Sequence, residues 1–145
     1  MKPFRHVPLA PAAAALGLTA GLGLGAVGGA AMSPPTEHAG LTVESLGVIP
    51  PAMMQRTVGL EGHRLQLRAI TIAPGGQIAK HAHADRPGLV KVVGGEWIEG
   101  RPGGEEAFPA DRAEAIVEDG DTVHWFHNRG DEPATAIVCD VTPEG

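Results

Sequence analysis

Turn-forming residues divide the chain from residue 62 onward into short apolar segments, and this pattern limits the fold more than any other feature. Apolar runs of strand length lie at 89–93, 97–98, 115–117, 122–126 and 134–141. Clusters of Gly, Pro, Asp and Asn separate these runs, as in Arg101-Pro102-Gly103-Gly104 and Asp119-Gly120-Asp121. Short strands that alternate evenly with turns are typical of a β-sandwich or β-barrel. The sequence therefore predicts an all-β domain.

Composition limits the chain to one compact domain. Its 145 residues, 43% of them hydrophobic, are enough for a single core. The 21 glycines and 13 prolines follow no three-residue period, which argues against a collagen. Because 17 acidic residues outnumber 11 basic ones and the net charge is -6, the composition also argues against a nucleic-acid partner.

The first 31 residues differ in composition from the rest of the chain. Lys2 and Arg5 give a positive start, and residues 6–36 contain no Asp, Glu, Lys or Arg. Small residues near position 30 suit signal peptidase. We expect residues 1–31 to be a secretory signal peptide, so that the mature protein is periplasmic or secreted and free of the membrane. An uncleaved membrane anchor is the alternative, which the glycines and Pro11 disfavour because they weaken a helix.

The mature chain divides into two expected parts. Residues 32–61 are expected to form an N-terminal linker and a first strand, with at most a short helical turn near Pro51, and residues 62–143 the barrel. Residues 62–73 alternate with period two, which is typical of a half-buried strand. One face of this strand is apolar and the other polar: His63, Leu65, Leu67 and Ala69 against Arg64, Gln66 and Arg68. A turn is expected next, at Pro74-Gly75-Gly76.

Three histidines are candidate metal ligands. His81 and His83 are separated by one residue, so on a strand their imidazoles project from the same face and can reach one ion. His124 lies in a later expected strand, and an antiparallel barrel can bring distant strands together. A third imidazole would complete a facial set with open positions for water or substrate. The spacing alone is equally compatible with two surface histidines.

The residues around these histidines resemble the two sequence motifs of cupins. The first motif is matched by Gly75-x5-His81-x-His83-x4-Gly88-x6-Gly95. The second motif ends in a histidine and, after three further residues, an asparagine, which His124 and Asn128 match. The match spans about residues 62–141 and is similar to small single-domain cupins of the quercetin-dioxygenase-like type. It implies an all-β fold, a single cupin barrel of the double-stranded β-helix or jelly-roll kind.

The resemblance also implies a glutamate ligand, which the sequence lacks at the expected place. Gly88 stands there and has no side chain that could coordinate a metal. Asp85, Glu99 and Asn128 are the accessory candidates for this role. The implied cofactor is one divalent transition metal, Fe, Mn, Ni, Cu or Zn. Without the carboxylate we expect Mn(II) and Fe(II) to bind less well than the other three, which imidazole suits.

Two functional hypotheses follow. The first is an exported metal-binding cupin that acts on a small oxygen-bearing organic substrate, with dioxygenase-like chemistry on a redox-active ion or Lewis-acid chemistry on an inert one. The second is a barrel that binds a small molecule or a metal without turnover, which the missing glutamate favours. No catalytic residue is assigned. The resemblance further implies a homodimer.

Overall fold

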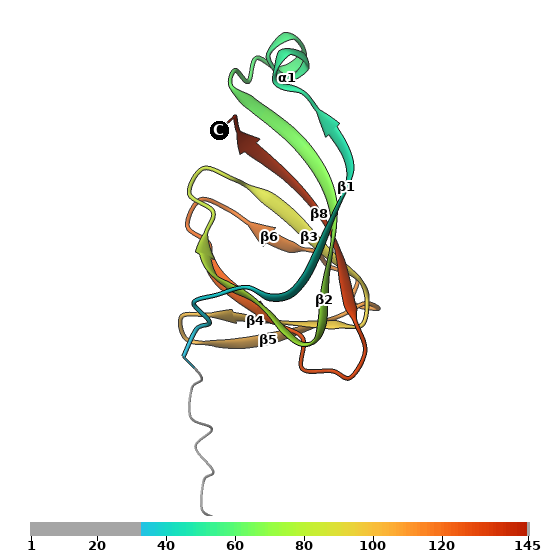
Figure 1. The fold of residues 1–145 in the computed structure, drawn as a ribbon. Helices are drawn as coiled ribbons and strands as arrows, with labels where there is room; N and C mark the ends of the chain where they lie inside the picture. Colours follow the sequence, from blue (N-terminus) through green and yellow to red (C-terminus); the bar gives the residue numbers. More distant parts are fainter. Residues whose placement is uncertain (1–32, 145) are drawn as a thin grey trace, which may run out of the picture. The chain divides into compact units, whose positions relative to one another are not determined.

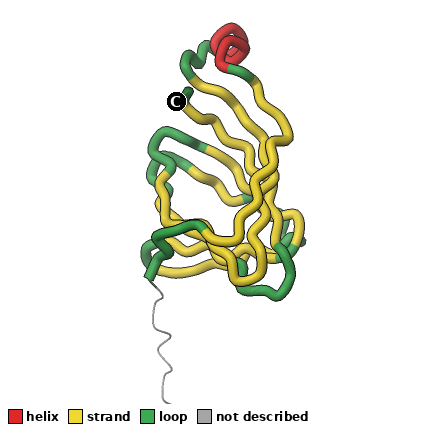
Figure 2. Tube along the Cα trace, viewed as in Figure 1, coloured by secondary structure: helices red, strands yellow, loops and turns green. Residues whose placement is uncertain are grey.

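Antiparallel strands make up most of residues 33–144, the part of the chain that the computed structural model describes (Figures 1 and 2). The predicted signal peptide, residues 1–31, lies outside the described residues. The elements are β1 (Ala39–Ile49), α1 (Pro51–Val58), β2 (His63–Ala82), β3 (Gly88–Gly94), β4 (Glu96–Arg101), β5 (Gly104–Pro109), β6 (Ile116–Glu118), β7 (Val123–His127) and β8 (Ala134–Pro143). Within residues 33–144, no helix combines the length and the apolar character that a membrane crossing requires.

The strands form one curled sheet in the order β5-β4-β7-β2-β8-β3-β6, with β1 added on β2. Strand β2 is central because its first part pairs with β1 and β8, and its last part pairs with β7. Figure 1 shows the sheet curving so that β3 and β6 face β2 across the interior. The prediction of an all-β single barrel is confirmed.

Strand β2 bends where the sequence predicted a turn. The chain does not reverse at Pro74-Gly75-Gly76, and β2 continues to Ala82. Its pairing with β1 shifts there, from Leu41↔Ile72 to Ala39↔Gln77. A Cβ on Gly76 would lie 2.8 Å from the carbonyl oxygen of Ala39, so only glycine fits this close backbone approach. The glycines therefore shape a bulge that turns the end of β2 toward β7.

The two faces of β2 are oriented opposite to the prediction. Ile70 and Ile72 are buried in the core, and Arg68 lies on the same face as these two residues. Leu67, which was expected in the core, is 38% exposed. His63 is also outside the core, and its Nδ1 lies 2.7 Å from the carbonyl oxygen of Glu61. The alternation itself is present, but its polar face is the one that points into the barrel.

Helix α1 is longer than the single turn that was expected. Proline at its first position suits a helix start, because the missing N–H would have no partner there. Gly59 ends the helix in the left-handed conformation, with φ at 72°, and its N–H bonds to the carbonyl oxygen of Gln55.

The interior is apolar at one end and polar at the other. The apolar core includes Trp97, Phe126 and Ile72, all nearly inaccessible to solvent. Strand β8 runs through both regions, since its buried residues change from Ala134, Ala136 and Val138 to Asp140 and Thr142. The polar end of the interior holds the predicted metal ligands.

Candidate metal centre

The three predicted histidine ligands come together from two paired strands. His81 lies near the end of β2 and is the register partner of His124 on β7. His83 follows β2 directly, and its backbone N–H donates to the carbonyl oxygen of Thr122, 3.0 Å away. His83 and His124 are buried, at 1% and 0% exposure. The bulge in β2 thus places both ends of the H-x-H pair against β7.

The Nε2 atoms of the three imidazoles converge on one point. The Nε2 of His124 lies 3.2 Å from the Nε2 of His81 and 3.0 Å from the Nε2 of His83. Each Nδ1, on the far side of its ring, faces an oxygen: Ala79 carbonyl at 2.8 Å, Arg86 carbonyl at 2.9 Å and Glu99 carboxylate at 2.6 Å. Acceptors at Nδ1 hold the proton there and leave Nε2 as a ligand atom. Three nitrogen lone pairs that face one another would repel, so either a proton on one Nε2 or a metal ion must lie between them.

A fourth donor, Glu118 at the end of β6, completes this cluster. Its Oε1 lies 3.4 Å from the Nε2 of His124, and its Oε2 lies 3.4 Å from the Nδ1 of His83. Ligand atoms from all four side chains lie within 4.8 Å of one another. Oε1 is thus the oxygen on the side of the Nε2 atoms. A buried carboxylate beside three imidazole nitrogens favours a cation between them.

Glu118 occupies the space that a side chain at Gly88 would take. The two residues are register partners on β3 and β6, and a Cβ on Gly88 would lie 2.8 Å from the Oε2 of Glu118. The carboxylate that the sequence motif places at residue 88 therefore comes from the neighbouring strand. Residue 88 offers no carboxylate, as expected, but Glu118 was not among the accessory candidates, because the sequence does not show that β6 pairs with β3.

The accessory candidates lie in three different places. Glu99 is buried and accepts from the Nδ1 of His124, so it orients this ring from behind and lies outside the group of converging donors. Asp85 is exposed in the turn after β2. Asn128 is buried, but its side-chain amide donates to the carbonyl oxygens of Ile72 and Glu132. It holds the loop after β7, and Asp85 and Asn128 are both outside the donor cluster.

The surroundings of the three histidines shift their pKa values in different directions. Burial lowers the pKa of His81 to about 4 and also lowers the pKa of His83. Burial lowers the pKa of His124 as well, but the carboxylates of Glu118 and Glu99 outweigh it and raise this pKa above 6.5. His81 and His83 therefore favour the neutral form that binds a metal, whereas His124 keeps its extra proton to a higher pH than an ordinary histidine, and a metal must displace that proton.

Metal binding is expected to release more protons near pH 6 than near pH 9, with a difference of at most about one. The sign follows from His124, which is protonated in the metal-free protein below its raised pKa and neutral above it. Isothermal titration of Zn(II) in buffers of different ionisation enthalpy measures the proton count at each pH. An equal count at both values would contradict this role of His124.

Gly88→Ala is expected to weaken metal binding by about tenfold and to destabilise the protein by about 2 kcal/mol. The added methyl group would lie 2.8 Å from the Oε2 of Glu118 and 2.9 Å from the Cβ of Asp140, so one of them must move. Gly94→Ala, on the same strand, is the control because its Cβ would meet nothing within 4 Å. Chelator competition and thermal unfolding measure both effects, and equal behaviour of the two variants would contradict the crowding at Gly88.

A pocket of about 350 Å³ opens onto the donor cluster. His81, His83 and Glu118 form part of its wall. The remaining wall is mainly apolar and comes from β1, β2, β3, β4, β7 and β8: Leu41, Val43, Ile70, Ile78, Val90, Trp97, Phe126 and Val138, together with His38, Arg68 and Arg86. A cavity of this size with a few convergent polar groups suits a small ligand.

Comparison with solved structures finds the same fold at low sequence identity. The cupin domain of an XRE-family transcriptional regulator from Enterobacter cloacae is 19% identical, with a TM-score of 0.53 over 72% of this chain and 99% of that chain. A predicted oxalate decarboxylase from Thermotoga maritima is 16% identical, with a TM-score of 0.53 over 74% and 92%. An oxalate oxidase in complex with glycolate is 22% identical, with a TM-score of 0.51 over 73% and 52%.

A comparison with curated proteins gives no significant match. The family model described as "Cupin domain" matches residues 68–140, about half of the chain. This match includes β3 to β7 and the four clustered donors. Sequence and fold therefore agree, and the chain belongs to the cupin-domain family.

Proposed function

We propose that this cupin binds one divalent transition metal through His81, His83 and His124, with the carboxylate of Glu118 as the fourth ligand. The observation that carries the proposal is the convergence of the three Nε2 atoms beside the buried carboxylate of Glu118, whose Oε1 lies 3.4 Å from the Nε2 of His124. Three imidazoles and one carboxylate suit Fe, Mn, Ni, Cu or Zn. Because Glu118 adds a hard oxygen donor, the expected discrimination against Mn(II) and Fe(II) no longer follows.

The proposed activity is the conversion of a small oxygen-bearing organic substrate in the adjoining pocket. When bound, a redox-active ion would supply dioxygenase-like chemistry, and a redox-inert ion would supply Lewis-acid chemistry. The protein contributes a fixed set of donors, since each imidazole is held through its Nδ1. It also contributes a mainly apolar wall, which limits the access of water to the site.

Elemental analysis of the full protein, purified without a histidine tag or chelator, tests the metal proposal. We expect about one transition-metal ion per chain in the parent and a large loss in His81→Ala. His63→Ala is the matched control, because His63 bonds to the backbone of Glu61 outside the site. A parent that takes up no metal after reconstitution, or a His81→Ala variant that binds metal as the parent does, would contradict the proposal.

A barrel that binds a metal or a small molecule without turnover is the second candidate. Its main support was the missing glutamate, and Glu118 weakens that support because it offers a carboxylate at the same place. Oxygen-consumption and isomerisation screens on the metal-loaded parent distinguish the two candidates. Turnover that disappears in His81→Ala supports the enzyme.

The proposal also includes export and a homodimer. The composition of residues 1–31 supports export, and mass spectrometry of the processed protein would identify cleavage near residue 31. The dimer is supported by apolar side chains that β1 exposes outside the pocket wall, such as Leu46, Val48 and Ile49. Light scattering measures the mass in solution, and a monomer would contradict this part.

A further inference from the structure

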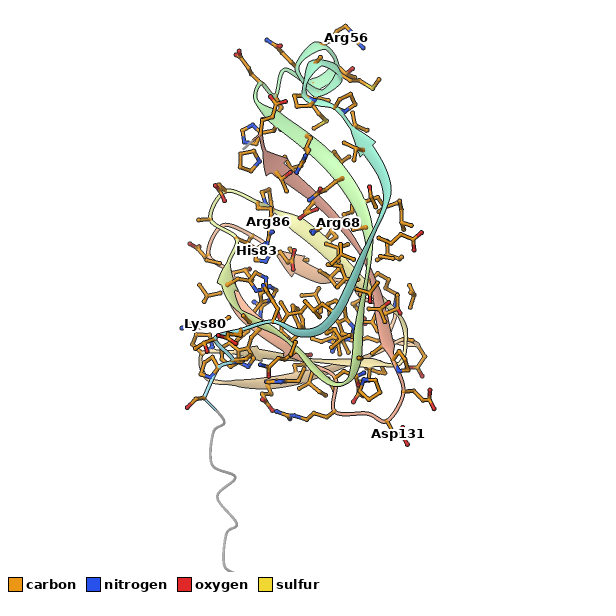
Figure 3. The ribbon with its side chains drawn as sticks, in the orientation of Figure 1. Arg56, Arg68, Lys80, His83, Arg86 and Asp131 are labelled. Atoms are coloured by element: carbon orange, nitrogen blue, oxygen red, sulfur yellow. The ribbon has the colours of Figure 1, made fainter. Side chains whose placement is uncertain are left out.

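The wall of the pocket contains two arginines to which the metal proposal gives no role. Arg68 comes from the inward face of β2, and Arg86 from the segment between β2 and β3. Figure 3 shows Arg68 and Arg86 near His83 in the middle of the domain, whereas Arg56 lies far away on α1. Both side chains are partly buried, with 20% and 33% of their surface exposed. Two guanidinium groups at the wall of a mainly apolar pocket call for an explanation.

Asp140 accounts for only part of their hydrogen-bonding capacity. One Nη of Arg68 donates to the Oδ2 of Asp140 at 2.7 Å, and the Nε of Arg86 lies 3.8 Å from the same oxygen. The Nε of Arg68 is buried without a partner among the described residues. Each guanidinium has five N–H donors, and Asp140 accepts a hydrogen bond only from Arg68, with Arg86 at ion-pair distance. Asp140 thus positions the arginines and leaves donors for a ligand.

The charges around the pocket favour an anion. Arg68 and Arg86 carry two positive charges, and Asp140 and Glu118 carry two negative ones, so these four side chains balance. A divalent ion at the proposed site would add two positive charges, and these four side chains would not offset them. His81, His83 and His38, the histidines in the wall, add no negative charge. An anionic ligand would neutralise the surplus.

We propose that Arg68 and Arg86 bind the carboxylate of a small organic acid whose remaining atoms lie in the pocket beside the metal site. Arginine suits this role because its planar fork binds both oxygens of a carboxylate at once. The apolar part of the acid would contact residues such as Leu41, Val43 and Val138. This inference rests on the proposed function for the position of the metal, and it narrows the substrate class to carboxylates.

Binding of butyrate, with butyramide as its neutral analogue, tests the inference in the full protein. Isothermal titration is carried out with metal-free and with zinc-loaded parent, Arg86→Gln and Arg56→Gln. Arg56→Gln removes the same charge from exposed helix α1 and serves as the control. We expect butyrate to bind the parent and the control alike, about tenfold weaker binding in Arg86→Gln, and no binding of butyramide.

The metal content of each variant separates this inference from the metal proposal. Arg86→Gln is chosen because Arg86 is the more exposed of the two arginines, and thermal unfolding confirms that the variant is folded. If Arg86→Gln keeps its zinc and binds butyrate like the parent, the inference is wrong, and the metal alone holds the acid. If the parent binds no metal but binds butyrate through Arg86, the metal proposal fails and the carboxylate site stands. No butyrate binding by either form of the parent would overturn the inference.

Discussion

Glu118→Gln is expected to lower the affinity of the protein for Mn(II) by about 100-fold and for Zn(II) by about tenfold. The substitution keeps the size of the side chain and removes the negative charge and the hard oxygen donor. Mn(II) depends on such a donor, whereas imidazole nitrogens suit Zn(II). Competition with a fluorescent chelator measures the dissociation constants of Mn(II) and Zn(II). A larger loss of affinity for Mn(II) than for Zn(II) would indicate that Glu118 acts as the hard oxygen donor.

The same variant is expected to lose more stability with metal than without it. In the metal-free protein it loses the contact between the Oε1 of Glu118 and the Nε2 of His124, which helps to raise the pKa of His124. Its melting temperature without metal should therefore fall only slightly. With metal the variant should melt lower than the parent, because weaker binding stabilises the folded state less.

Glu44→Gln serves as the control for Glu118→Gln, because Glu44 is an exposed glutamate on β1, outside the donor cluster. It should leave both metal affinities and both melting temperatures unchanged. Unchanged Mn(II) affinity in Glu118→Gln would show that Glu118 is no ligand. An equal loss of stability in both metal states would assign it a structural role alone.

The histidines of this site could be predicted from sequence, but its carboxylate could not. In a strand, residues two positions apart project from the same face, so His81 and His83 were expected on one face. This expectation does not depend on where the strand begins or ends. Glu118 depends on which strand lies beside β3, which is a property of the topology. The sequence did contain one local signal for Glu118. In β6, Ile116 and Glu118 are buried and Val117 between them is exposed, so the strand's two-residue period places Glu118 on the inward face at the end of the apolar run.

The orientation of Arg68 is a second feature that the sequence did not predict. The alternation in residues 62–73 correctly separates two faces of β2, but it does not say which face lies inside. We expected the face with Leu65 and Leu67 to be buried, and this rule fails here because the opposite face, with Arg68 and Ile70, lines the pocket. Asp140, on the neighbouring strand β8, meets Arg68 inside the barrel. Polar residues on the inner face of a strand are therefore a signal for a binding site.

Gly100→Ala is expected to destabilise the protein by about 3 kcal/mol, through the close approach of β4 and β7. Gly100 is buried on β4 and is the register partner of Trp125, and a Cβ at this position would overlap the indole ring. Trp125 is only 6% exposed, so the ring has little room to move away. The melting temperature should fall by about 10 °C, as measured by thermal unfolding of the metal-free protein.

Gly100→Ala is also expected to affect the metal site, because β7 carries both Trp125 and His124. Displacement of Trp125 shifts the residue beside this ligand, so metal affinity should fall together with stability in Gly100→Ala. Gly104→Ala, on the adjacent strand β5, is the matched control, since its Cβ would meet nothing within 4 Å. It should melt at the temperature of the parent or slightly above, because alanine reduces the entropy of the unfolded chain. Equal melting of the two variants would contradict the close packing of Trp125 on Gly100.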